Sequence, residues 1–266
     1  MTYQLIDSGE GLKLEQFGPY RILRPCPQAL WRKAHPKEWE LIDAEFSREN
    51  KKGWTYHKKL PKEWIAEIGG VKFRIAPTDF GHLGAFPEHA GLWQHLPAEG
   101  NILNLFAYSG GATMSFAKRG AKVCHLDASK GMVDWARENA KLNDLEKAPI
   151  RWIVDDAIKF LRREERRESC YDGILLDPPT FGRGAQGEVF KIEVDIVPLL
   201  ELCKRVLSPN PKFVVVSCHT PGVTPLVLEH LARQVFPKTQ IQTGEMCLTS
   251  ESALSIPSGS YAKILY

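Results

Sequence analysis

The stretch NLFAYSGGATMSFAKRG, residues 104–120, joins the end of a short apolar run to the start of a helical pattern. Gly110 and Gly111 stand at the junction, where glycines let the backbone approach a ligand and the first amides of a helix face it. The spacing is not the G-x-G-x-x-G of dinucleotide-binding proteins, because no glycine follows Gly111 at the required distance. We therefore predict a ligand-binding turn between a strand and a helix; a tight turn with a structural role only is the alternative.

Outward from this turn, short apolar runs alternate with amphipathic helical patterns. The runs lie at 102–106, 122–127, 150–154, 171–176 and 213–216. Runs this short and this apolar suit strands that helices cover on both faces. Pro198 is expected in the first turn of one helix, which ends before Ser208. The alternation predicts an α/β fold with a Rossmann-like, doubly wound sheet over residues 96–266.

Residues 1–95 show a different pattern. Glycine and proline separate short strand-like pieces, among them 12–15, 20–23 and 71–75. The segment also needs to bury five tryptophans: Trp31, Trp39, Trp54, Trp64 and Trp93. We predict a smaller β-rich N-terminal extension over 1–95 that packs against the main domain and is a candidate for RNA contact.

Composition excludes several classes of protein. The chain has 266 residues, of which 43% are hydrophobic and 25% charged, and a formal net charge of +3. Its six cysteines are scattered without a CxxC pair, which argues against a disulfide framework or a zinc knuckle. His82, His89 and His95 form no convincing metal-binding set, so no metal is expected. Neither a secretory signal nor a membrane span is indicated, so a soluble, cytoplasmic protein is expected.

Two later strands end in acidic residues. The second strand runs into Asp127, Ala128 and Ser129, where a carboxylate is placed to accept both hydroxyls of a ribose. The third is followed by Asp156 and Ala157, where the carboxylate is placed to accept the amino group of an adenine. Each acidic residue is alternatively a helix N-cap. Ribose and adenine sites without a phosphate cradle predict S-adenosyl-L-methionine as the cofactor.

Taken in order, N-L-F-A-Y-S-G-G, H-L-D-A-S, D-D-A, D-P-P-T-F and V-S-C resemble the motifs of class I S-adenosylmethionine-dependent methyltransferases. The resemblance covers about residues 71–220. More narrowly, the chain is similar to the bacterial large-subunit rRNA cytosine-5 methyltransferase subgroup. It implies an enzyme that methylates RNA, with rRNA the favoured partner. The chain departs from that subgroup because it is too short for the additional PUA-type RNA-binding module.

The resemblance also implies a set of site residues. Phe86, like His89, lies in a loop that matches the segment folding over the cofactor, although ordinary packing is an equal alternative. The implied substrate-binding residues follow the fourth strand: Pro178, Pro179, Thr180 and Phe181. The implied cofactor-binding residues are Phe86, Tyr108, Ser109, Gly110, Gly111, Asp127, Ala128, Ser129, Asp156, Ala157 and Asp177.

Asp177 and Cys218 end two strands that are expected to be neighbours, and neighbouring strands lie about 4.8 Å apart. Carbon 5 of cytosine attacks a sulfonium methyl only after a thiolate adds to carbon 6, with an acid near N3 to assist. We therefore predict that Cys218 is the nucleophile and Asp177 the acid. His219 is placed to lower the pKa of the thiol, with a side chain that points away as an equal alternative. A cysteine packed in the core is the alternative.

Other functions stay open. Asp177 without Cys218 suits an N-methyltransferase acting on a purine base or another polar acceptor, although Thr180 stands where adenine N-methyltransferases usually have an aromatic residue. A fold does not fix chemistry, so a cofactor-binding protein without this chemistry, or a NAD-dependent oxidoreductase, is also compatible.

One further segment suits nucleic acid. RENKKGWTYHKKLPKEW, residues 48–64, interleaves basic and aromatic side chains, which is the pattern that binds single-stranded or looped RNA. A solvated loop is the alternative. Nothing in the sequence indicates the oligomeric state.

Overall fold

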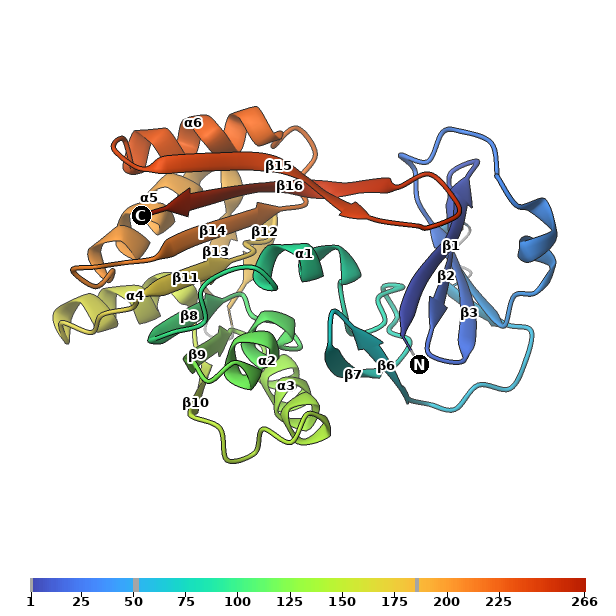
Figure 1. Cartoon of the computed structure of the whole chain (residues 1–266), viewed down its shortest axis with the longest axis horizontal. Coiled ribbons are helices and arrows are strands. Elements are labelled where there is room, and N and C mark those ends of the chain that lie inside the picture. Colours follow the sequence, from blue (N-terminus) through green and yellow to red (C-terminus); the bar gives the residue numbers. More distant parts are fainter. Residues whose placement is uncertain (1, 50–52, 185–186) are drawn as a thin grey trace. The chain divides into compact units, whose positions relative to one another are not determined.

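The computed structural model describes residues 2–49, 53–184 and 187–266. The chain forms two compact units, drawn in Figure 1. The first unit is Met1–Ala90 with Cys247–Ser258, and the second is Gly91–Met246 with Gly259–Tyr266. The division expected from the sequence, 1–95 and 96–266, stays a prediction; residues 247–258, which it assigned to the larger domain, belong here to the first unit.

The second unit is built on a seven-stranded sheet in the order β10-β9-β8-β11-β14-β16-β15. Its first five strands in that order are parallel, and β16 runs antiparallel to β14. This confirms the α/β prediction, because the order reverses at β8, as a doubly wound sheet requires. The strands are β8 (Asn101–Leu105), β9 (Lys122–Asp127), β10 (Ile150–Val154), β11 (Gly173–Leu176), β14 (Phe213–Cys218), β15 (Gln240–Leu248) and β16 (Ile256–Leu265).

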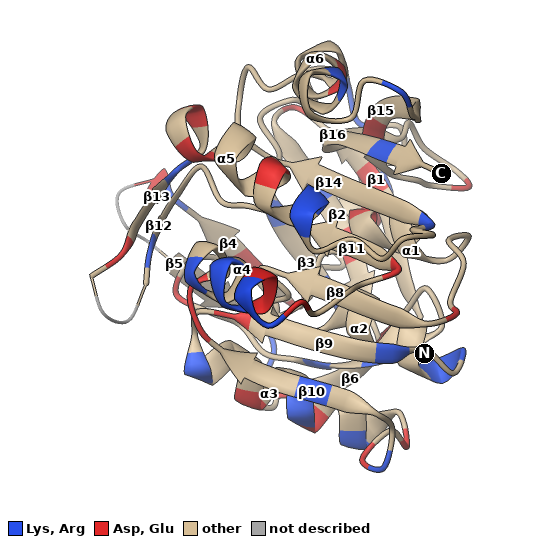
Figure 2. Cartoon of the chain, turned by 90° about the vertical axis from the view of Figure 1, so that its left-hand side faces the viewer, with Lys and Arg blue, Asp and Glu red and all other residues tan. Residues whose placement is uncertain are grey.

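Helices cover both faces of the sheet. The α-helices of the described residues are α1 (Ala90–Trp93), α2 (Gly111–Lys118), α3 (Lys130–Leu142), α4 (Ala157–Arg166), α5 (Ile192–Arg205) and α6 (Pro225–Val235). The three last helices share one hydrophobic core with the strands, while α2 and α3 contact β9. In Figure 2 the central strands β8, β11 and β14 are almost free of charge, whereas α4 carries many charged residues. Burial on both faces therefore explains why these strands read as continuous apolar runs.

Helix α5 corrects one prediction. Pro198 was expected in the first turn, but the helix begins six residues earlier, at Ile192. Ile196, Leu199 and Cys203 continue its buried face at helical spacing. The helix runs through the proline because this face packs into the core.

The first unit is β-rich, as predicted. A five-stranded sheet has the order β1-β2-β3-β4-β5, and β6 and β7 form a separate antiparallel pair. Among the described residues, the unit also contains the short 3-10 helices η1 (Pro36–Glu40) and η3 (Pro87–His89). The strands are β1 (Tyr3–Gly9), β2 (Leu12–Phe17), β3 (Tyr20–Pro25), β4 (Ala44–Ser47), β5 (Gly53–Tyr56), β6 (Trp64–Ile68) and β7 (Val71–Ile75). Among the described residues, no helix is long and apolar enough to cross a membrane.

Candidate active site

The turn after β8 has an unusual backbone. Phe106, Tyr108 and Gly110 all have positive φ angles, of 53°, 49° and 88°. A Cβ added at Gly110 would lie 2.9 Å from the Cε of Met114 and 3.2 Å from the Cβ of Ala136. Glycine is therefore needed at this position for the left-handed backbone and for close packing of the turn on α2 and α3. Packing on α2 and α3 is thus a second role for Gly110, besides the predicted approach of the backbone to a ligand.

Buried side chains hold this turn in place. The Nδ2 of Asn139, on α3, donates a hydrogen bond to the carbonyl oxygen of Ser109 at 2.9 Å. Beneath the turn, the Nδ2 of Asn104 donates to the Oγ1 of Thr113 at 3.0 Å, and that hydroxyl lies 2.9 Å from the Nδ1 of His125. Burial lowers the pKa of His125 to about 3, so the ring is neutral. The predicted cofactor loop is thus hydrogen-bonded to α3 and lies over a buried polar cluster.

Asp127 ends β9 beside this turn. Its Oδ2 accepts a hydrogen bond from the backbone N–H of Tyr108 at 2.8 Å, and its Oδ1 accepts one from the N–H of Ser129 at 2.9 Å. Burial raises the pKa of Asp127, while these two N–H groups act in the opposite direction. Each carboxylate oxygen has a second lone pair, so the fixed carboxylate suits the two hydroxyls of a ribose. The residues around it fit the predicted cofactor.

The other predicted cofactor residues lie on the turns that flank Asp127. Ser109 is 2% exposed, so only its backbone suits ligand contact, whereas Gly111 opens α2. Ala128 is half-buried, and Ser129 caps α3 by accepting from the N–H of Met132 at 3.4 Å. All of them follow the carboxyl ends of β8 and β9, the edge at which doubly wound sheets bind ligands.

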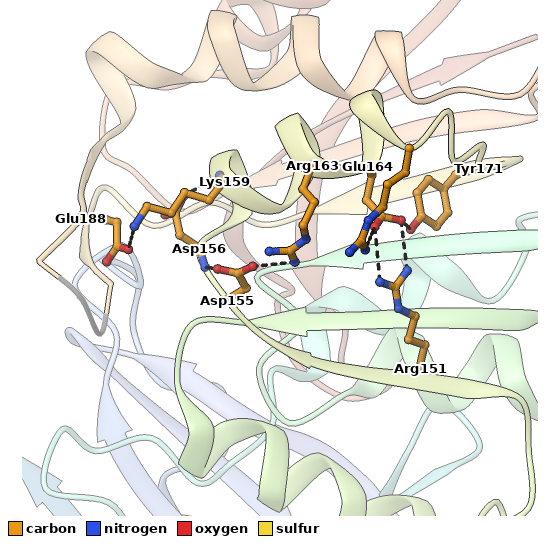
Figure 3. A network of polar contacts seen from close by, with 9 residues as sticks. Arg151, Asp155, Asp156, Lys159, Arg163, Glu164, Tyr171 and Glu188 are labelled. Carbon is orange, nitrogen blue, oxygen red and sulfur yellow. Dashed lines mark hydrogen bonds and ion pairs between the residues drawn. The ribbon is translucent and has the colours of Figure 1, made fainter.

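Asp156 is the N-cap of α4. Its Oδ1 accepts a hydrogen bond from the backbone N–H of Lys159 at 2.9 Å, and Ala157 begins the helix. The preceding Asp155 is paired with Arg163 at 2.7 Å, as Figure 3 shows. One carboxylate oxygen of Asp156 therefore caps α4, which was the alternative to a role in cofactor binding. The contact of Asp156 with adenine stays a prediction.

Asp177 follows β11, and its nearest partner on β14 is Ser217. The register pairs Leu176 with Val216, so Ser217 lies opposite Asp177. The hydroxyl of Ser217 donates to the Oδ1 of Asp177 at 2.7 Å, and the Nε2 of His219 lies 3.9 Å from its Oδ2. Ser217 was not among the predicted site residues, which included only Cys218 from this strand. The register of β11 with β14 identifies Ser217 as the residue opposite Asp177.

Cys218 faces away from this cluster. Side chains alternate along a strand, so Cys218 shares the face of Val214 and Val216, in the core beneath α5 and α6. It is 1% exposed, and burial raises the pKa of its thiol, against a hydrogen bond from the N–H of Thr220 at 3.4 Å. His219 is not among the groups that shift this pKa, so the predicted lowering by His219 is not seen. The role of Cys218 as nucleophile stays a prediction.

The residues after Asp177 lead into a short antiparallel pair of strands. Pro178 is buried, while Pro179 and Thr180 are exposed and lead into β12 (Phe181–Arg183), which pairs with β13 (Val189–Lys191). The Oγ1 atoms of Thr180 and Thr220 lie 2.7 Å apart, which ties this turn to the end of β14. Phe181 is 51% exposed, with the Arg183 guanidinium over its ring at 5.8 Å. Such a surface suits the predicted contact with a base.

Phe86 belongs to the first unit. There its ring meets His82 edge-on at 5.3 Å and stacks on His89 at 5.8 Å between ring centroids. These contacts are the packing that the sequence analysis weighed equally with a role over the cofactor. That role stays a prediction.

A family model described as S-adenosylmethionine-dependent methyltransferase matches residues 47–242. The ribosomal RNA large subunit methyltransferase K/L of Shewanella sp. (strain ANA-3) is 34% identical over 178 residues, which cover 63% of this chain and 25% of that protein. The chain thus corresponds to about a quarter of the length of such relatives.

Two solved structures are similar over the full chain. The S-adenosylmethionine-dependent methyltransferase from Agrobacterium tumefaciens is 36% identical, with a TM-score of 0.94 that covers 100% of this chain and 90% of the other. SMU.776, a putative methyltransferase in complex with SAH, has a TM-score of 0.81 at 19% identity, covering 100% of this chain and 75% of the other, and shares the fold.

Proposed function

This chain belongs to the S-adenosylmethionine-dependent methyltransferase family, and we propose that it methylates RNA, with rRNA the favoured substrate and a nitrogen of a purine base the acceptor. The family makes the chain an enzyme that uses S-adenosyl-L-methionine. The choice of rRNA is supported by relatives named as ribosomal RNA large subunit methyltransferases. The choice of acceptor comes from the geometry at the ends of β11 and β14.

The single observation that carries this choice is the opposite facing of Ser217 and Cys218. Ser217 bonds Asp177 at the edge of the sheet, whereas Cys218 is buried in the core with a raised thiol pKa. A thiol attacks as the thiolate, so burial in apolar surroundings makes a poor nucleophile. The acceptor site therefore offers a carboxylate, a hydroxyl and an imidazole, which are groups that hold a polar base.

The residues of this chain then act by placing the acceptor. When bound, S-adenosylmethionine supplies the sulfonium methyl group. Asp177 accepts a hydrogen bond from an N–H group of the base, and Ser217 fixes the carboxylate by donating to its other oxygen. The exposed ring of Phe181 suits stacking with the base. Tyr108 and Ser129 hold the carboxylate of Asp127 through their backbone N–H groups for the ribose of the cofactor.

Carbon 5 of cytosine is the second candidate. It is favoured by the place of Cys218 at the very end of β14, one residue from the side chain that bonds Asp177. In this reaction the thiolate adds to carbon 6 and the acid assists at N3. It requires the thiol to turn out of the core.

The two acceptors are separated by methyl transfer to RNA from cells that lack the gene. Asp177→Asn should lose on the order of 100-fold or more in rate at saturating cofactor, because the amide cannot replace both acceptor oxygens. Cys218→Ala should keep the rate of the parent within about two-fold. Cys203→Ala, another buried cysteine, is the matched control for loss of core packing. Loss of transfer in Cys218→Ala alone, with cofactor binding intact, would restore the carbon-5 mechanism.

A further inference from the structure

The first unit contains an open groove of about 550 Å³, distant in sequence from the methyl-transfer motifs. It lies where β5 ends and the chain runs on to β6. Its walls are Tyr56, Lys58, Lys59, Leu60, Pro61, Lys62 and Pro77. The lining thus combines one aromatic ring, a floor of leucine and prolines, and three cationic side chains. The volume is in the range of sites that take one small ligand or nucleotide.

The ring of Tyr56 lies beside that of Trp54 and is about half exposed to solvent. Trp54, two residues earlier, has its Nε1 bound to the carbonyl oxygen of Thr78 at 2.7 Å and its ring against Phe46. The ring of Tyr56 lies nearly parallel to that of Trp54, at 22°, with 6.3 Å between centroids. Tyr56 nevertheless remains 51% exposed. A ring held in place with an open face is a stacking platform for an unpaired base, which presents its own flat face in any sequence.

The charges around the groove leave two lysines to a ligand. The Nζ of Lys58 pairs with the buried Asp43 at 2.6 Å, and Glu63 pairs with Arg74 at 3.3 Å. Among the described residues, no carboxylate lies within ion-pair distance of Lys59 or Lys62, and both are exposed. Asp43 and Glu63 are thus each paired with a cation, and Lys59 and Lys62 add positive charge to the lining of the groove. This excludes a cationic ligand and favours a polyanion.

We propose that this groove binds an unpaired stretch of the RNA substrate, with a base on Tyr56 and the neighbouring phosphates at Lys59 and Lys62. The inference rests on the proposed function for the identity of the polyanion. It narrows that function to RNA whose target lies beside single-stranded nucleotides, because a base in a duplex cannot reach the ring. Of the segment 48–64 singled out in the sequence, Asn50, Lys51 and Lys52 lie outside the described residues.

The test is equilibrium binding of the full chain to a fluorescent ten-nucleotide single-stranded RNA and to the same length of duplex. We expect the single strand to bind more tightly. Tyr56→Ala should weaken it about 10-fold, while Tyr56→Phe, which keeps the ring, should match the parent. The double variant Lys59→Gln, Lys62→Gln should lower the salt slope by about 1.4, since each phosphate contact on a single strand contributes about 0.7. Lys37→Gln, an exposed lysine of the same unit, is the control.

The outcomes separate this inference from the proposed function. The proposal that the groove binds RNA would be overturned by variants that fold as the parent does and bind the single strand with equal affinity and equal salt slope. Tighter binding of the duplex, or of polyglutamate in competition, would also overturn it. Methyl transfer is measured alongside. If the groove does not bind RNA but the enzyme methylates it, every groove variant methylates RNA with an unchanged KM. If the proposed function itself is wrong, the parent enzyme methylates no RNA at all.

Discussion

At the scale of single residues, the account depends on which way each side chain faces. Asp127, Asp177 and Cys218 were all identifiable from their places at strand ends. Which atoms they meet was not, because a one-residue difference along a strand moves a side chain to the other face. Ser217 and Cys218 illustrate this: the first bonds Asp177, and the second lies in the core. The sequence identified the two strands, and the strand register adds Ser217 as the residue that bonds Asp177, while the role of Cys218 stays a prediction.

Asp127 gives the first residue-scale prediction. Asp127→Ala should weaken binding of S-adenosylmethionine by about 1–3 kcal/mol, because two ribose hydroxyls would lose their acceptor. Isothermal titration calorimetry of the folded variant measures this. Asp134→Ala, which removes an exposed carboxylate from α3, is the control and should bind as the parent does. An unchanged Kd for Asp127→Ala would place the ribose elsewhere.

At the scale of elements, α4 shows how the sheet is held together away from the site. Glu164, only 1% exposed, accepts hydrogen bonds from both terminal nitrogens of the Arg151 guanidinium and from the hydroxyl of Tyr171, as drawn in Figure 3. Burial alone would raise the pKa of Glu164, but these donors together lower it below its ordinary value. The buried carboxylate thus joins α4 to β10 and to the chain before β11.

Glu164→Gln should lower the free energy of unfolding at pH 7 by about 2 kcal/mol, since hydrogen bonds to a charged group are lost in a buried place. Because the pKa of the folded state lies below the ordinary value of 4.5, the stabilisation is complete above that pH and is lost as the pH falls through the folded-state pKa. Urea denaturation at pH 7 and pH 3.5 should therefore show a difference that shrinks at the lower pH. The exposed pair of Glu165 with Arg205 supplies the control, Glu165→Gln, with a change below about 0.5 kcal/mol. An equal loss at both pH values would contradict this account of Glu164.

The elements themselves were largely predictable, for physical reasons. The runs 122–127 and 150–154 coincide with β9 and β10. The run 213–216 lies in β14, where every residue is buried, as expected of a strand covered on both faces. The start of α5 was not predictable from Pro198, since propensity gave way to burial of the helix face. Pairings between distant segments, such as Trp54 with Thr78, depend on tertiary contacts that no local pattern contains.

At the scale of the whole molecule, methyl transfer and RNA binding are proposed for different units. The second unit carries the cofactor turn, Asp127 and the acceptor cluster at Asp177, while the first carries the groove at Tyr56. The formal net charge of +3 is modest for the RNA binding that we propose. Recognition is therefore expected to rely on local sites such as this groove, and on stacking, more than on a general positive field.

The most direct test of the central claim is mass spectrometry of nucleosides from RNA methylated with S-adenosylmethionine that carries a deuterated methyl group. The RNA comes from cells lacking the gene, and the parent enzyme is compared with Cys218→Ala and Asp177→Asn. We predict a deuterated N-methylpurine in equal amount with the parent and with Cys218→Ala, and almost none with Asp177→Asn. Deuterated 5-methylcytidine that disappears in Cys218→Ala would contradict the proposed acceptor and make Cys218 the nucleophile.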